Sequence, residues 1–434
     1  DSVAHCTPCG NTLASTLGAL GALIAGVAVV RHLVVGCYRT LPDGRKKELE
    51  RRFKLYGFGR KLKIAISFYM IACEMGTVYE LNLPEAVQRF LESMSVVVTL
   101  CINILLRTMP LECAGLSGFT AALRFWFLMP IVVVLVILVI YAVAIRSRSP
   151  GEVGLRAAPI ILQFLFLVYP IVTRHAFEAF SWYEFTDDGH FLRADVSIEH
   201  GSSAHATASG MAVTAIICYP VGLLLVFGGV LLHQRHPILS GPPTGLSTAI
   251  RFLYGAFEPQ FFWWELVEMS RRFLLVGVYV TVRQGTIEQL LYGSFTALLY
   301  LALQVQATPY KERADDFFAS VCSLLLLVLF MAAIPYKYAA LTDSNALQAT
   351  MSNEQRTDFL PPYVVLSAVM LAACVGVLAV LAVILALKMR EDRARMRREA
   401  LAAEARRLCW LANDSQVVLD RLADGQYHLF LSHV

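Results

Sequence analysis

The sequence predicts an all-α, polytopic membrane protein with about nine transmembrane helices, an N-terminus outside and a C-terminus in the cytosol. Three observations predict this class. Of the 434 residues, 57% are hydrophobic and 16% are charged, whereas soluble domains carry about 25% charged residues. Apolar runs close to the length that crosses a bilayer recur along the chain. Lys and Arg residues gather in clusters between those runs, which orients a membrane protein.

Nine apolar runs are candidate spans, because a helix needs about 20 apolar residues to cross ~30 Å of hydrocarbon. In chain order they are Leu13 to Val35, Leu62 to Tyr79, Phe119 to Ile145, Ala157 to Thr173, Gly210 to Leu232, Trp263 to Val282, Leu290 to Ala307, Phe317 to Ile334 and Tyr363 to Leu387.

A tenth run, Ser93 to Arg107, is shorter, contains Asn103 and leads into a Met-Pro pair. The loop charges decide whether it spans, because cytosolic loops carry the excess Lys and Arg. The first loop, Arg39 to Lys63, is strongly basic and therefore cytosolic. If the tenth run does not span, the later basic loops are also cytosolic and the acidic loop Glu178 to Glu199 is outside. We therefore predict an outer re-entrant or interfacial segment.

The two ends of the chain have a different character. The first residue is Asp1, with no basic leader before the first apolar run, and we expect the chain to be a segment of a longer protein. After Leu387, apolar residues recur at helical spacing among many charges. This pattern predicts a cytosolic helix that continues the last span, lies along the inner leaflet or serves as a solvated linker.

Charged residues at bilayer depth cost several kcal/mol unless they are paired or face water. The densest group opens the sixth span, where four charges at three- and four-residue intervals can form a ladder on one helix face. The ladder is either a structural lock or a gate. The preceding aromatic pair is typical of the headgroup level and predicts two interfacial anchors. These residues are Glu265, Glu268, Arg271 and Arg272, with Trp263 and Trp264 as the anchors.

Glu74 lies inside the second span with no obvious partner on its own helix. It must face protein, water or a cation, or be protonated. A structural carboxyl group and a site on an ion pathway both remain open. Gln304 and Gln306, near the inner end of the seventh span, are weaker candidates, because amide side chains also hold helices together.

The sequence lacks the motifs of several classes of enzyme and of metal-binding protein. The loop histidines His190, His200 and His205 match no metal-binding spacing, and we expect them to be exposed. No phosphate-binding loop, dinucleotide fingerprint or nucleophile elbow is present in the sequence. We therefore predict no enzyme, no catalytic residue, no cofactor, no metal and no nucleic-acid partner.

Several stretches together resemble a known family. They are Lys63 to Tyr69, Leu83-Pro84, Tyr219 to Gly222, Phe252 to Tyr254, Trp263 to Glu265 with Arg271-Arg272, and Thr308 to Lys311. The chain resembles the TRP-like, or polycystin-like, transmembrane region of large protist surface proteins, which is distantly similar to the fungal TRP-like flavin carriers.

The resemblance implies soluble parts on both sides of the membrane. Cys6 and Cys9 are similar to the end of an ephrin-receptor-like, cysteine-rich repeat, which implies an external disulfide. The segment Tyr427 to Val434 resembles the first strand of a TIR-like domain, or is a chance strand-like tail. The implied organisation is the end of a cysteine-rich repeat (1–12), a transmembrane domain (13–388), a cytosolic helical linker (389–425) and the start of a TIR-like domain (426–434). Cysteines expected between the fourth and fifth spans are absent from the sequence.

Three functions from different classes follow. The first is a TRP-like cation channel, or a channel-like sensor, that couples an extracellular cysteine-rich stalk to a cytosolic module. The second is a non-conducting signalling receptor or adhesion scaffold. The third is a transporter of a lipid or small solute, for which a lipid-open groove lined by Gln304, Gln306 and the Arg271/Arg272 pair is expected. The expected partners are membrane lipids, cations and further copies of the chain, and the expected location is the plasma membrane.

Overall fold

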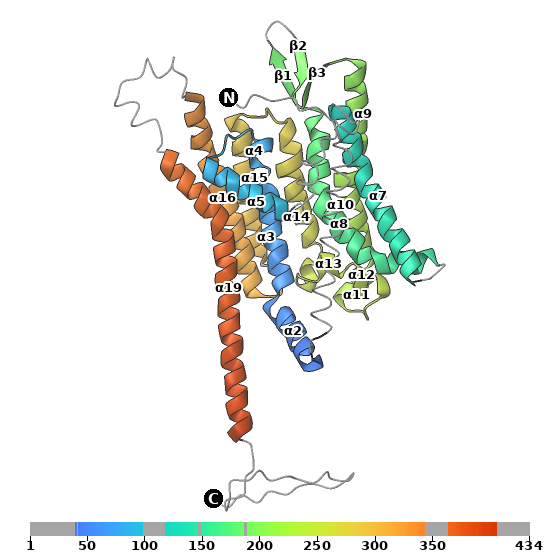
Figure 1. The fold of residues 1–434 in the computed structure, drawn as a ribbon, viewed down its shortest axis with the longest axis vertical. Coiled ribbons are helices and arrows are strands. Elements are labelled where there is room, and N and C mark those ends of the chain that lie inside the picture. Colours follow the sequence, from blue (N-terminus) through green and yellow to red (C-terminus); the bar gives the residue numbers. More distant parts are fainter. Residues whose placement is uncertain are drawn as a thin grey trace, which may run out of the picture. The chain divides into compact units, whose positions relative to one another are not determined.

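The computed structural model describes residues 40, 42–98, 118–145, 149–185, 189–342 and 363–405 (Figure 1). In this part of the chain, six helical segments are long and apolar enough to cross a membrane. The prediction of a predominantly α-helical, multi-pass membrane protein is confirmed. The six are α7 (Phe119–Ile145), α8 (Pro150–Glu178), α9 (Ser203–Ile216) continued by η2 (Ile217–Val221) and α10 (Gly222–His233), α15 (Ile287–Ala307), α16 (Arg313–Thr342) and α19 (Tyr363–Ala405).

The second predicted span is broken, and the sixth changes helix type along its length. The second comprises α3 (Phe58–Ala72) and α4 (Met75–Val78), separated at Cys73 and Glu74. The sixth comprises α14 (Trp264–Arg272), a π-helical turn η4 (Phe273–Gly277) and a 3₁₀ turn η5 (Val278–Thr281). The first predicted span lies outside the described residues. The number of nine crossings therefore stays a prediction.

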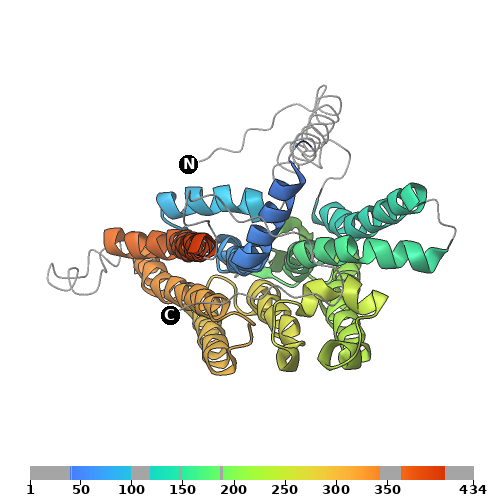
Figure 2. The same cartoon turned by 90° about the horizontal axis from the view of Figure 1, so that it is seen from below.

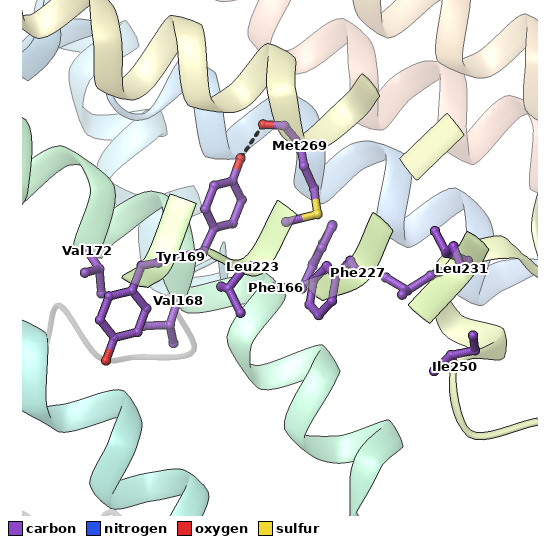
Figure 3. Close-up of a cluster of buried hydrophobic side chains, with 11 residues drawn as sticks. Phe166, Val168, Tyr169, Val172, Leu223, Phe227, Leu231, Ile250 and Met269 are labelled. Carbon is purple, nitrogen blue, oxygen red and sulfur yellow. Dashed lines mark hydrogen bonds between the residues drawn. The ribbon is translucent and has the colours of Figure 1, made fainter. Parts of the chain in front are cut away.

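A hydrophobic cluster holds α8, α10 and α14 together (Figure 3). The phenol of Tyr169 on α8 donates a hydrogen bond of 2.6 Å to the carbonyl of Met269 on α14. Phe227 and Leu231 of α10 are almost fully buried beside them. Gly277 permits a second close approach, because a Cβ atom there would lie 2.5 Å from Thr173 Cγ2 of α8. These contacts fix the register of α14 and η4 against α8.

The other helices pack on the opposite flank of α14. The phenol of Tyr79 donates a hydrogen bond of 3.0 Å to the carbonyl of Leu275 in η4. Phe330 of α16 would lie 2.6 Å from a Cβ atom at Gly293, so the glycine permits close packing of α15 and α16. Tyr69 of α3 donates a hydrogen bond of 2.7 Å to the carbonyl of Cys374 in α19. The second half of α3, from Ser67 to Ala72, is thus buried by protein.

Short elements mark the two ends of the helices (Figure 1). The sheet end carries an antiparallel sheet of β1 (Trp182–Phe185), β2 (Gly189–Leu192) and β3 (Asp195–Glu199). The opposite end carries α11 (Arg235–Leu239), α12 (Gly245–Ala249) and α13 (Arg251–Tyr254). The acidic loop predicted outside thus lies at one end, and a basic loop predicted in the cytosol lies at the other. The sheet itself was not predicted, because the loop lacks a hydropathy signal.

Helix α5 (Glu85–Val98) lies across the direction of the other helices near the sheet end (Figures 1 and 2). It includes the first residues of the predicted outer segment, Ser93 to Val98, and begins eight residues earlier than that segment. The orientation agrees with an interfacial segment for this part. The rest of the run lies outside the described residues. Helix α2 (Asp43–Tyr56), in the basic first loop, precedes α3.

Asp195 joins the sheet to the start of α7. One carboxylate oxygen accepts a hydrogen bond of 2.9 Å from the backbone N–H of Phe119, and the other accepts bonds from the hydroxyl and the N–H of Ser197. Burial opposes ionisation of Asp195, but these three donors outweigh it and lower the pKa of the carboxyl group below 3.8.

We expect this contact to weaken in acid. A lowered pKa means that the ionised form stabilises the fold, so the stabilisation is present above pH 3.8 and is lost as pH falls through the lower folded-state pKa. In Asp195→Asn the amides of Phe119 and Ser197 should exchange hydrogen faster at pH 6 than in the wild type. Glu199→Gln, on the same strand, should leave both amides unchanged. Equal protection in all three proteins would contradict the prediction.

Candidate functional site

A stripe of polar and sulfur-containing side chains runs along one face of α3 and continues to Glu74, two residues beyond the end of this helix. Its members are three or four residues apart, the spacing that places side chains on one helix face. Its part within α3, from Arg60 to Met70, covers about 15 Å of helix at 1.5 Å per residue, compared with ~30 Å for the hydrocarbon core. We call it the α3 stripe, and it consists of Arg60, Lys63, Ser67, Met70 and Glu74.

At the sheet end of the stripe, Glu74 forms an ion pair with Arg174 of α8. The Glu74 Oε2 to Arg174 Nη1 distance is 2.8 Å. Arg174 also lies 3.5 Å from Glu178, whose other oxygen is 2.9 Å from His175 Nδ1. The ring of His175 stacks on Trp126 at 4.9 Å between ring centres. The carboxylate that lacked a partner on its own helix thus has one on another helix.

A cavity of about 350 Å³ lies against this pair. Helices α3, α4, α5 and α8 form its wall, and charged, amide and hydroxyl groups line much of it. Glu74 and Glu92 contribute two negative charges and Arg174 one positive charge, so the lining is net negative when all three are ionised. Such a wall attracts cations. The polar lining residues are Cys73, Glu74, Thr77, Asn82, Gln88, Glu92, Ser95 and Arg174.

The middle of the stripe faces Glu268 of α14, which is the centre of a buried polar network. One carboxylate oxygen lies 2.9 Å from Arg271 Nη2 and accepts a hydrogen bond of 3.2 Å from the Ser67 hydroxyl. The other oxygen accepts a hydrogen bond from the phenol of Tyr300 on α15. The guanidinium of Arg271 stacks on the Tyr300 ring, with 3.8 Å from Cζ to the ring centre. Three helices thus meet at one carboxylate.

Glu265 and Arg272 form the next layer. Arg272 Nη2 lies 3.4 Å from a Glu265 oxygen, and the other oxygen pairs with Lys63 of the α3 stripe. The guanidinium of Arg272 lies 4.1 Å above the Phe166 ring of α8 and donates to the sulfur of Met70 at 3.4 Å. Both Glu265 and Arg272 are 1% exposed. Pairing and cation–π contact replace the water that these charges lose.

The opposite end of the stripe is held by α16. Arg60 Nε lies 2.7 Å from one oxygen of Asp315, and Lys61 pairs with the other. Arg60 also pairs with Glu312. The side chains of Lys61 and Asp315 are both 0% exposed. This second network of ion pairs connects α3 to the start of α16.

Two small cavities continue the line of the larger one along α3. One of about 10 Å³ lies beside Ser67, Glu268 and Arg271, and one of about 20 Å³ lies beside Arg60, Lys63 and Glu265. Each is comparable to the volume that one water molecule needs. The α3 stripe therefore borders a wide polar cavity at the sheet end and, further along, two narrow spaces that touch the ion pairs but have mainly apolar walls.

The structure brings most of the predicted site residues together, with two exceptions. The four charges of the predicted ladder do pair along α14, and they are buried among the neighbouring helices: Glu268 pairs with Arg271, and Glu265 pairs with Arg272. Gln304 is buried and accepts a hydrogen bond of 2.7 Å from Ser323, which also accepts from Arg271. Gln306 is exposed and does not join this network. Glu74 lies at the other end of the stripe.

The predicted anchors differ from each other. Trp263 is 40% exposed and has surface to offer to lipid, whereas Trp264 is 3% exposed and packs against Phe261 and Tyr300. Consecutive helical residues point about 100° apart, so both rings cannot face lipid equally. Trp264 is therefore buried by protein, and the interfacial role of the two residues stays a prediction. Cys6 and Cys9 lie outside the described residues, as do the cysteine-rich and TIR-like ends.

Sequence reasoning missed the partners that other helices supply. The sequence assigns Lys63 to the basic first loop. It places Arg174 directly after the predicted end of the fourth span, with no indication of a partner. Nothing in the sequence distinguishes Lys61, Asp315 or Tyr300 as site residues. The one signal available was Glu74 itself, because a buried carboxylate needs a cationic partner.

The histidines of the sheet end form an aromatic group rather than a metal site. The rings of His200 and His205 are 4.7 Å apart, and both pack edge-on against Trp182. Within the described residues, no group of three His, Cys, Asp or Glu side chains is arranged to hold a metal ion.

Comparison with known proteins found no match among protein-family models, curated proteins or solved structures. Fold and site together define a multi-pass, α-helical membrane protein with a buried line of ion pairs between its helices.

Proposed function

We propose that this chain is a cation channel or channel-like sensor, with the α3 stripe as its pathway in a closed state. The observation that carries the proposal is the succession of cavities beside the α3 stripe, from a wide polar cavity of about 350 Å³ at Glu74 to small cavities of about 10 and 20 Å³ beside the ion pairs of Glu268 and Lys63. Ionisable groups inside a membrane protein commonly mark ion pathways. The net negative wall of the wide cavity favours cations at its entrance.

The ion pairs explain why the pathway is closed. Glu268 and Arg271 fill the space beside Ser67, and the narrow cavities there are too small for a hydrated ion. Conduction therefore requires α3 and α14 to separate, and the interruptions at Glu74 and η4 are the places where each helix can bend. An outer stalk and a cytosolic module, as the family resemblance implies, would pull on these two helices from opposite sides of the plasma membrane.

The proposal is tested by recording currents from purified protein in planar bilayers under tension, voltage and acid. We expect cation currents from the wild type. Glu74→Gln should reduce the cation current several-fold, because it removes one negative charge from the entrance cavity. Glu288→Gln, a half-exposed carboxylate paired with Arg283, is the matched control and should leave the current unchanged. Silent bilayers under all three stimuli would contradict the channel.

One observation favours the non-conducting scaffold as the second candidate. The charged residues of the α3 stripe and of α14 form ion pairs, as a structural lock requires. The same recordings decide between the two functions. The groove that a transporter would need, lined by Gln304, Gln306 and the two arginines, is not formed by the described residues, because Gln304 is buried and Gln306 is exposed elsewhere.

A further inference from the structure

Helix α7 has 27 residues, and Arg124 is its one charged residue. Only 11% of the most apolar stretch of this helix is buried inside the protein, so α7 faces lipid over most of its surface. Arg124 is itself exposed. It forms no hydrogen bond or ion pair with any residue in the described parts of the chain. A charge in that position requires a partner from outside the described residues.

The depth of Arg124 places that partner near the headgroups. Arg124 follows the first residue of α7 by five positions, which is about 7.5 Å of helix. The start of α7 is fixed at the sheet end by the bond from Phe119 to Asp195. A long arginine side chain at this depth reaches the headgroup level while its methylene groups stay in the apolar layer.

A groove of about 380 Å³ opens beside Arg124, between α7 and α9. Apart from Arg124 and the Thr214 hydroxyl its lining is apolar. The hydroxyl of Thr214 is already bonded to the carbonyl of Gly210 at 2.8 Å. Gly210 has open space where a side chain would be, which keeps this part of the groove free. The remaining lining residues are Phe127, Leu128 and Met211.

We propose that this groove binds a glycerophospholipid of the leaflet on the sheet side. The lipid phosphate pairs with the Arg124 guanidinium, which offers several donors in a planar array suited to phosphate. One acyl chain lies along Phe127, Leu128 and Met211. The inference goes beyond the proposed function and does not depend on it, since a channel and a scaffold could both hold this lipid.

Native mass spectrometry of the purified protein with added phosphatidylglycerol tests the site. We expect Arg124→Leu to bind the lipid about tenfold more weakly than the wild type, the effect of about 1.4 kcal/mol. Arg124→Lys should bind with intermediate affinity, because it keeps the charge but not the planar donors. Arg283→Leu is the matched control and should bind as the wild type does, since it removes a solvent-exposed arginine outside the groove.

A second variant and two further probes distinguish a bound phospholipid from a bound anion. Gly210→Leu fills the groove, keeps Arg124 and should also weaken binding. Diacylglycerol with the same acyl chains should bind weakly to the wild type and equally weakly to Arg124→Leu, and glycerol 3-phosphate should not displace the phospholipid. Unchanged binding in Arg124→Leu or Gly210→Leu would overturn the proposal. Displacement by glycerol 3-phosphate would do the same, because it would indicate an anion site without an acyl chain.

Discussion

Replacing Glu268 by alanine is expected to lower the free energy of unfolding by about 3–5 kcal/mol, the usual effect of removing one partner of a buried ion pair. The carboxylate accepts from Ser67 and Tyr300 and neutralises Arg271. Without it, the Arg271 guanidinium remains buried, at 7% exposure, with two hydroxyl groups at 3.3 and 3.4 Å and the Tyr300 ring beside it. Unfolding of the purified protein by sodium dodecyl sulfate, followed by circular dichroism, measures the change.

Two further variants separate this electrostatic effect from the loss of side-chain volume. The double variant Glu268→Leu/Arg271→Met removes both charges and keeps much of the volume, so it should recover most of the lost stability. Glu288→Ala, at a half-exposed ion pair, should change stability by less than about 1 kcal/mol. A double variant as unstable as Glu268→Ala would show that the charges of the pair are not the cause.

The positions of the spans could be predicted because hydropathy reports a strong physical constraint. A helix in lipid satisfies its own backbone groups, so each span requires a long apolar run. The six continuous spans of the described chain all coincide with predicted runs. The interruptions at Glu74 and in η4 could not be predicted, because they change the backbone hydrogen-bond register without changing mean hydropathy. Glu74, for example, donates its N–H to Ile71, three residues earlier.

The ion pair within one helix could be predicted from the sequence, whereas the ion pairs between helices could not. The pairing of Glu268 with Arg271 follows from a spacing of three residues on one helix. Lys63 lies about 200 residues from Glu265 in the sequence, and Arg174 lies 100 residues from Glu74. Hydropathy does not show which helix faces meet. The members of the α3 stripe have a helical spacing that is visible in the sequence. However, Arg60 and Lys63 lie in the basic first loop, which the excess of Lys and Arg assigns to the cytosol.

The lipid-facing residues illustrate a related limit. The aromatic pair Trp263 and Trp264 predicted two anchors because tryptophan prefers the headgroup level. Only a structure shows which of two adjacent side chains faces outward. Arg124 lies within a predicted span, and a lone arginine there acquires meaning only when its exposure and its lack of a partner among the described residues are known.

Asp315→Ala is the second change for which we expect a large loss of stability, again about 3–5 kcal/mol. Asp315 is fully buried and pairs with both Arg60 and Lys61 of α3. Its removal leaves the buried Lys61 ammonium with Glu312 at 4.0 Å as its nearest carboxylate among the described residues. Arg60 keeps its pair with the partly exposed Glu312, so the penalty falls mainly on Lys61. Denaturant unfolding in detergent measures the change.

A double-mutant cycle assigns this loss to the contact between Lys61 and Asp315. Lys61→Met removes the ammonium and keeps an unbranched, apolar side chain, so Lys61→Met/Asp315→Ala should be more stable than Asp315→Ala alone. Asp43→Ala, at a pair whose carboxylate side chain is 91% exposed, should be nearly neutral. Additive effects of Lys61→Met and Asp315→Ala would contradict a coupled pair. A double variant that loses less stability than the sum of the two single variants would show that Lys61 and Asp315 stabilise the contact between α3 and α16 together. This contact lies at the end of the α3 stripe that is opposite the cavity at Glu74. Separating α3 from α16 there would separate the two charges.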